Sequence, residues 1–156
     1  MVLSTQTVIQ SIHVTEKPAF EIVPMAAGII LLIITLILAI CRFIFKRKFK
    51  MYFALLFFVA GIAGCLIWFV AFVSVHPVTY PNWNVFFFHP LYFIASVGYL
   101  LPKTYRFITW YHWINFVLLS AFLIAWPFIP QELNNANIPF VLCLWIGLGL
   151  RLKVKR

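Results

Sequence analysis

The sequence contains uncharged apolar runs long enough to cross a lipid bilayer, and no other feature restricts its fold as strongly. Residues 51–75 carry no charged side chain, and residues 25–41 form a second uncharged run. A transmembrane helix needs about 20 mainly apolar residues, because each residue adds ~1.5 Å and the hydrocarbon core is ~30 Å thick. With 65% hydrophobic and 10% charged residues, the chain has too little polar surface to cover a water-soluble domain. The sequence therefore predicts an integral membrane protein.

Five apolar segments follow one another, separated by short polar stretches. The predicted spans are about 24–45, 51–75, 85–101, 107–129 and 138–154, after an N-terminal arm of residues 1–23. Pro24 suits the first helical turn, and the fifth span is marked by Asn137 as a cap and by Pro139 in its first turn. The fifth span is short, so we extend it past Arg151, whose long side chain can reach the interface. We expect one all-α membrane domain over residues 24–156, a bundle of five transmembrane helices.

Basic residues gather at and just after the ends of the first, third and fifth spans. Eleven of the twelve Lys and Arg residues lie there, namely Arg42, Lys46, Arg47, Lys48, Lys50, Lys103, Arg106, Arg151, Lys153, Lys155 and Arg156. The three acids, Glu16, Glu21 and Glu132, fall on the opposite side. The positive-inside rule makes the basic side cytoplasmic, so we expect the N-terminus outside and the C-terminus in the cytoplasm. This topology accounts for the net charge of +9. The sequence has no stripe of basic residues interleaved with exposed aromatic residues, so it does not predict binding to nucleic acid.

A polar motif lies on the predicted outer face. It comprises His76, Pro77, Asn82, Trp83, Asn84, His89 and Pro90, together with Glu132 from the next outer loop. A structural interpretation explains most of it, because proline at position 77 ends the second span and Trp83 suits the membrane interface. Asn82 or Asn84 can cap the next helix by accepting a hydrogen bond from its first turn.

The same motif also permits a catalytic interpretation. His76 or His89 could act as a general base, and asparagine amides could stabilise an oxyanion, as acyl transfer at the membrane surface requires. No nucleophile is fixed beside the histidines, since Ser74 and Thr79 are close only in sequence. The two histidines and Glu132 are zinc-ligand types, but their spacing matches no zinc motif, so we expect neither a metal nor a cofactor.

Two histidines and one asparagine lie within the predicted spans. His89 lies one turn inside the third span, where its ring must find a partner or a water-filled cavity, and it is therefore a better functional candidate than His76. His112 and Asn115 are three residues apart, on one face of the fourth span near its cytoplasmic end. We expect these two to bond to neighbouring groups or to a facing helix as structural residues.

Small residues in the second span predict a close helix contact. Ala60, Gly61, Gly64 and Cys65 fall on one helical face. Because small side chains let backbones approach each other, this face is expected to receive another segment of the bundle.

Several stretches together resemble a known family. They are "GIAGCLIWFVAFVSVHPVTYPNWNVFFFHPLYFI", "YHWINFVLL", "WPFIPQELN" and "LCLWIGLG", in this order. They resemble the five-helix transmembrane region at the C-terminal end of Lnb-type lipoprotein N-acyltransferase proteins. The resemblance covers roughly residues 24–150.

The resemblance implies a bacterial inner membrane and lipid-linked substrates. Family members carry an N-terminal periplasmic domain before the five helices, and the characterised type moves a fatty acid within a lipoprotein to the amino group of its lipidated cysteine. Only 23 residues precede the first span here, so we expect the soluble domain to come from a protein partner. The expected function is a non-catalytic anchor, or a subunit that presents lipid or lipoprotein to that partner. The alternative is a small membrane acyltransferase with His89 or His76 as general base.

Overall fold

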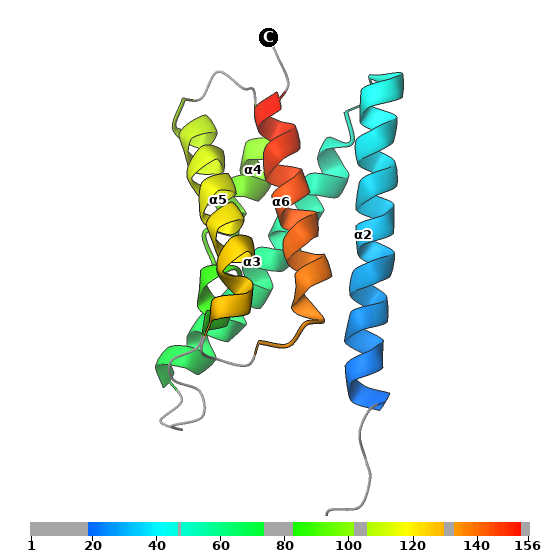
Figure 1. Cartoon of the computed structure of the whole chain (residues 1–156). Helices are drawn as coiled ribbons and strands as arrows, with labels where there is room; N and C mark the ends of the chain where they lie inside the picture. The colour runs from blue at the N-terminus through cyan, green and yellow to red at the C-terminus, as the bar shows by residue number, and fades with distance from the viewer. Residues whose placement is uncertain (1–18, 47, 74–82, 102–105, 130–132, 154–156) are drawn as a thin grey trace, which may run out of the picture.

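The computed structural model describes residues 19–46, 48–73, 83–101, 106–129 and 133–153, and these residues form helices and short connections without a β-strand (Figure 1). The α-helices are α2 (Ala19–Phe45), α3 (Lys50–Val73), α4 (Tyr92–Leu100), α5 (Arg106–Ala125) and α6 (Asn137–Lys153). Two 3-10 helices are η2 (Trp83–Phe86) and η3 (Trp126–Phe128). The all-α fold class with five helices is confirmed.

Three of the helical segments are long and apolar enough to cross a membrane. They are Val23–Phe45, Lys50–Val73 and Arg106–Phe128. Helix α6 has 17 residues, and α4 has only nine. At ~1.5 Å per residue α4 is about 14 Å long, which is half the thickness of the hydrocarbon core.

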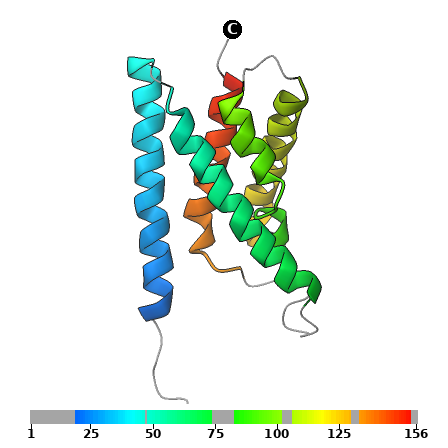
Figure 2. The ribbon, with the colours of Figure 1, turned by 180° about the vertical axis from the view of Figure 1, so that it is seen from behind.

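The helices form a bundle in which the first helix packs mainly against the last. Helix α2 contacts α6, α6 contacts α5, α5 contacts α4, and α4 packs along α3. Figure 2 shows α3 crossing the bundle diagonally with α4 at its side. The centre is filled by aromatic and aliphatic side chains that are fully buried, including Phe53, Phe57, Tyr92, Leu144 and Leu148. The apolar residues that face outward, such as those of α2, are suited to lipid.

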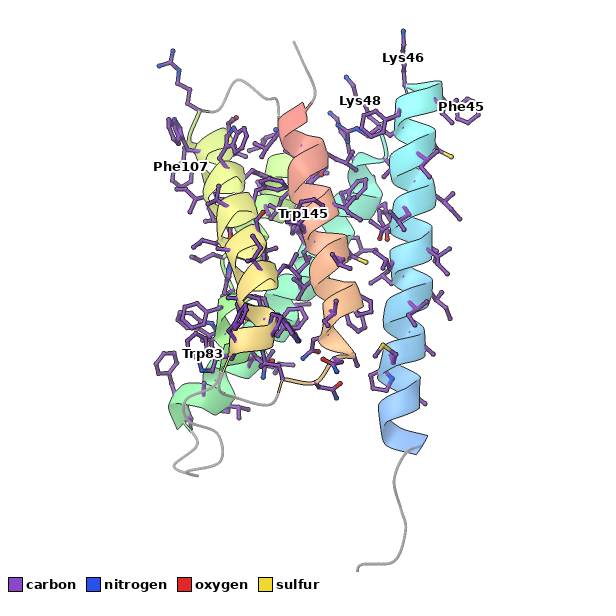
Figure 3. All side chains as sticks on the ribbon, in the orientation of Figure 1. Phe45, Lys46, Lys48, Trp83, Phe107 and Trp145 are labelled. Carbon is purple, nitrogen blue, oxygen red and sulfur yellow. The ribbon has the colours of Figure 1, made fainter. Side chains whose placement is uncertain are left out.

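The connections alternate between two ends of the bundle. The C-terminal ends of α2, α4 and α6 and the starts of α3 and α5 lie at one end, which we call the basic end (Figure 1). Lys46 and Lys48 mark the basic end, and Trp83 lies at the opposite end (Figure 3). We call the opposite end the Trp83 end. The labelled lysines are thus separated from Trp83 by the length of the bundle.

Two predicted segments differ from the structure. Helix α2 begins at Ala19, so residues 19–23 are helical and Pro24 lies inside the helix. The third predicted span, 85–101, is not one continuous helix, because η2 ends at Phe86 and α4 begins only at Tyr92. Pro90 explains the interruption, since it lacks an N–H and disfavours helical backbone at the residue before it.

Candidate functional site

The structure describes half of the predicted polar motif. His76, Pro77, Asn82 and Glu132 lie outside the described residues, whereas Trp83, Asn84, His89 and Pro90 are described. The predicted role of His76 as a general base therefore stays a prediction. The described part of the site is built around the interruption at His89 and Pro90, between η2 and α4.

Gly64 of α3 allows this interruption to enter the bundle. A Cβ atom on Gly64 would lie 2.4 Å from the carbonyl carbon of His89 and 2.7 Å from its Cα. These distances are shorter than any tolerable contact, so α3 meets the backbone of the interrupted segment directly. One turn earlier, a Cβ on Gly61 would lie 3.0 Å from the ring of Phe93. The close contact predicted from the small residues is confirmed for these glycines, whereas Cys65 is exposed.

The backbone groups at the interruption have partners. The N–H of Tyr92 donates to the carbonyl of His89 at 3.2 Å, and the N–H of Phe93 donates to that of Pro90 at 3.1 Å. The hydroxyl of Tyr111, on α5, donates to the carbonyl of Leu91 at 2.6 Å. Irregular backbone at membrane depth is tolerated only where protein buries it and satisfies its polar groups. Helix α5 therefore stabilises the interrupted segment from one side while α3 packs on the other.

The ring of His89 is held by Asn115. The Nδ2 of Asn115 donates to the carbonyl of Tyr111 at 2.8 Å, so the amide oxygen faces His89. The Nε2 of His89 lies 3.0 Å from that oxygen, and it must be the donor because an amide oxygen only accepts. In the neutral ring Nδ1 is consequently left with a lone pair, and this buried atom has no hydrogen-bond partner among the described residues.

Tyr92 covers one face of the imidazole ring of His89. The two rings are stacked with centroids 4.1 Å apart and planes 17° apart. Tyr92 is fully buried, and its hydroxyl has no hydrogen-bond partner in the described part of the chain. Two unpaired polar atoms, Nδ1 of His89 and the hydroxyl of Tyr92, therefore come from residues one turn apart. We call His89, Tyr92, Tyr111 and Asn115 the interior site.

The interior site lies deep in the bundle. Asn115 is the tenth of the 20 residues of α5, so it lies about 14 Å from either end of that helix. The prediction that Asn115 lies near the cytoplasmic end of its span is therefore wrong. Its partner is a facing segment of the bundle, as the sequence predicts. The pairing of Asn115 with His89 could not be read from the sequence, because it depends on how far the interrupted segment enters between α3 and α5.

His112 does not join this site. Its Nδ1 lies 2.7 Å from the carbonyl of Ile108, one turn earlier in its own helix. The ring is fully buried and packs against Gly98, where a Cβ atom would lie 2.7 Å from its Cε1. The structural role predicted for His112 fits these contacts, since the ring fills space between α4 and α5.

Asn84 has a different role from the predicted cap, and Asn82, the other predicted cap, lies outside the described residues. Leu91 occupies the N-cap position of α4, and no side chain caps that helix. The prediction that Asn84 caps this helix is therefore wrong. The Oδ1 of Asn84 instead accepts a hydrogen bond of 3.4 Å from Nδ2 of Asn137, which links η2 to the start of α6. Trp83 stacks on Phe86, with ring centroids 5.3 Å apart, at the Trp83 end (Figure 3).

Neither described serine is hydrogen-bonded to His89, as a nucleophile would be to its base. The hydroxyl of Ser96 donates to the carbonyl of Ala54 at 2.7 Å, and that of Ser120 donates to the carbonyl of Phe116 at 2.7 Å. Ser120 also accepts a bond of 2.8 Å from the indole of Trp145. Within the described ranges no three His, Cys, Asp or Glu side chains are grouped so that they could hold a metal ion.

Comparison with known proteins gives one match. The family model described as the Lnb transmembrane domain matches residues 15–156. No curated protein and no solved structure matches the chain significantly. The matched range includes every described element and also the segments that carry His76 and Glu132.

Proposed function

The chain belongs to the family of Lnb transmembrane domains, and from this we propose that it is a non-catalytic membrane module acting with a partner that carries a periplasmic domain. The module lies in the bacterial inner membrane with its Trp83 end toward the periplasm. It presents a lipid or lipoprotein surface at the outer leaflet, and the partner supplies the groups that react.

One observation carries this proposal. The interior site uses its polar groups to hold the bundle together, since Asn115 fixes the ring of His89 and Tyr111 fixes the carbonyl of Leu91. The described serines donate to backbone carbonyls elsewhere. Acyl transfer needs a nucleophile within hydrogen-bond reach of its base. A site that orients the interrupted segment and bonds to neither described serine supports a positioning role.

Purification of the full chain from its native membrane in mild detergent tests this proposal. We expect a second envelope protein with a soluble domain to copurify at fixed stoichiometry, and we expect acyl transfer to a lipoprotein substrate only when that protein is present. A monodisperse chain that catalyses the transfer alone would overturn the proposal. The variant Asn135→Ala serves as a control for the purification, because this substitution changes only an exposed side chain at the Trp83 end.

The free lone pair on Nδ1 of His89 favours a second candidate, a small membrane acyltransferase with His89 or His76 as general base. In that case His89→Gln, which retains a hydrogen-bonding group toward Asn115, should abolish acylation of a lipoprotein substrate while the chain remains folded. His76→Ala is the parallel variant. Unchanged activity in both variants would exclude the catalytic role, and gel filtration would verify that each variant is folded.

A further inference from the structure

Two buried polar atoms of the interior site are not used by the bundle. Nδ1 of His89 and the hydroxyl of Tyr92 have no hydrogen-bond partner among the described residues, whereas Nε2 of His89 is bound to Asn115. The rings that carry the two atoms are stacked with centroids 4.1 Å apart, so both atoms belong to one compact group. Native proteins rarely leave buried polar atoms unpaired, because an unpaired group loses its hydration without compensation.

The two atoms require a ligand group that both donates and accepts a hydrogen bond. A charged imidazole is disfavoured at membrane depth, so the ring of His89 is neutral and its Nδ1 only accepts. The phenol of Tyr92 has a proton to donate. A hydroxyl group fits both, because its O–H donates to Nδ1 while its oxygen accepts from the phenol. A carbonyl or an ester lacks the donor, and an aliphatic amine would carry a charge.

The interior site lies beside the lipid-facing surface of the bundle. Leu91 and Ile114, which adjoin site residues in the chain, are each 56% exposed. The bond from the hydroxyl of Tyr111 to the carbonyl of Leu91 is exposed as well. Because the site lies about 14 Å from either end of α5, it is level with the hydrocarbon and not with the headgroups. A neutral molecule dissolved in the bilayer can approach it, whereas a charged headgroup is excluded by the depth.

We propose that the interior site binds the hydroxyl group of a neutral lipid alcohol, such as a diacylglycerol, between His89 and Tyr92. The acyl chains of the ligand remain in the lipid beside Leu91 and α5. A water molecule offers the same O–H group, but the bilayer core dissolves neutral lipid and contains no water. The site does not depend on the proposed function, because it involves neither a periplasmic partner nor the orientation of the chain.

Dioctanoylglycerol and its acetyl ester test the site on the full, delipidated chain in a detergent without hydroxyl groups. The two compounds share their acyl chains, but the ester lacks the O–H. We expect dioctanoylglycerol to raise the melting temperature, and the ester to leave it unchanged. In Tyr92→Phe the apparent affinity should fall about fivefold, the effect of one lost hydrogen bond. The matched control is Tyr99→Phe, whose lost hydroxyl donates to Gly147, and its affinity should change by less than about twofold.

Nitrogen NMR of chain labelled at its histidines supplies a second readout at the atom itself. The Nδ1 resonance of His89 is identified by its absence from His89→Gln. We expect this resonance to move when dioctanoylglycerol is added and to stay in place with the ester. His112 is the internal reference, because its Nδ1 lies 2.7 Å from the carbonyl of Ile108.

The two readouts distinguish a lipid from water and from a site that the chain fills itself. Equal melting shifts with both compounds, and equal affinities in Tyr92→Phe and Tyr99→Phe, would overturn the proposal. A magnetisation transfer from water to Nδ1 of His89 without added alcohol, and no response to dioctanoylglycerol, would keep the hydroxyl site and overturn its assignment to a lipid. A Nδ1 resonance with neither a water contact nor a response would show that the chain fills the site, and would overturn the proposal.

Discussion

Gly64 is the residue on which the entry of the third span depends. Its missing side chain brings the backbone of α3 against the backbone of His89, and a backbone adjusts less easily than the end of a side chain. Other glycines of the bundle face flexible side chains instead. Gly149, for example, would place a Cβ 3.1 Å from the ring of Phe116. The two glycines therefore form a natural comparison between a rigid contact and a contact that can adjust.

We expect Gly64→Ala to destabilise the protein by about 2 kcal/mol or more, because the added methyl group overpacks a backbone contact and this outweighs the gain in helix propensity of ~1 kcal/mol. Gly149→Ala should change stability by less than about 0.5 kcal/mol, since Phe116 can move and alanine favours the helix. Unfolding in mixed detergent micelles, followed by circular dichroism, measures both. Equal effects of the two substitutions would show that the contact of His89 with Gly64 is not rigid.

Tyr92 and Tyr99 form a second comparison within one helix. Both are almost fully buried in α4, but the hydroxyl of Tyr99 donates to Gly147, whereas that of Tyr92 has no partner among the described residues. We expect Tyr99→Phe to cost about 1 kcal/mol, because it leaves a buried carbonyl without its donor, and Tyr92→Phe to be neutral or stabilising. The same unfolding assay compares them. A loss of stability in Tyr92→Phe would reveal a bound water or ligand at its hydroxyl.

At the scale of elements, the sequence predicts where helices lie better than it predicts how they are interrupted. Helix α3 begins at Lys50 and α6 at Asn137, each one residue before the start predicted from the apolar pattern. The segment 85–101 is equally apolar, so its average hydropathy indicates a span while Pro90 divides it locally. The rule that proline disfavours helix at the preceding residue would have placed the interruption at His89.

The partners of His89 could not be predicted in the same way. Asn115 is separated from it by 26 residues, and their contact depends on Gly64 admitting the interrupted segment to the middle of α3. The small-residue pattern indicates that something packs there, but not which residue. Cys65 shows the same limit of the small-residue pattern. Its side chain is small enough for the predicted contact face, but it is exposed and does not point into the bundle.

A double-mutant cycle measures the bond between the interrupted segment and α5. The variants are His89→Ala, Asn115→Ala and the double substitution. We expect a coupling energy of about 0.6 kcal/mol or more, the average for hydrogen bonds between membrane helices. Ser120→Ala with His89→Ala is the control pair, because Ser120 bonds to Trp145 instead. A coupling of zero between His89 and Asn115 would contradict the geometry of the interior site.

For the whole molecule, the fold separates charge by alternating the connections between two ends. Lys46, Lys48, Lys50, Arg106 and Arg151 all belong to the basic end. The bundle itself does not distinguish one side of a membrane from the other. The positive-inside rule predicts that the basic end, with its excess of cations, faces the cytoplasm. The proposed function depends on this orientation, since lipoproteins meet the module only if the Trp83 end faces the periplasm.

Thiol labelling in spheroplasts determines the orientation. In a chain whose three cysteines are replaced by alanine, Asn135→Cys and Lys48→Cys place single thiols at exposed positions at opposite ends. We expect a membrane-impermeant maleimide to label position 135 in intact spheroplasts, and to label position 48 only after the membrane is permeabilised. The reverse pattern would turn the Trp83 end toward the cytoplasm. In that case no lipoprotein of the periplasmic leaflet could reach the module, and its proposed role would fail.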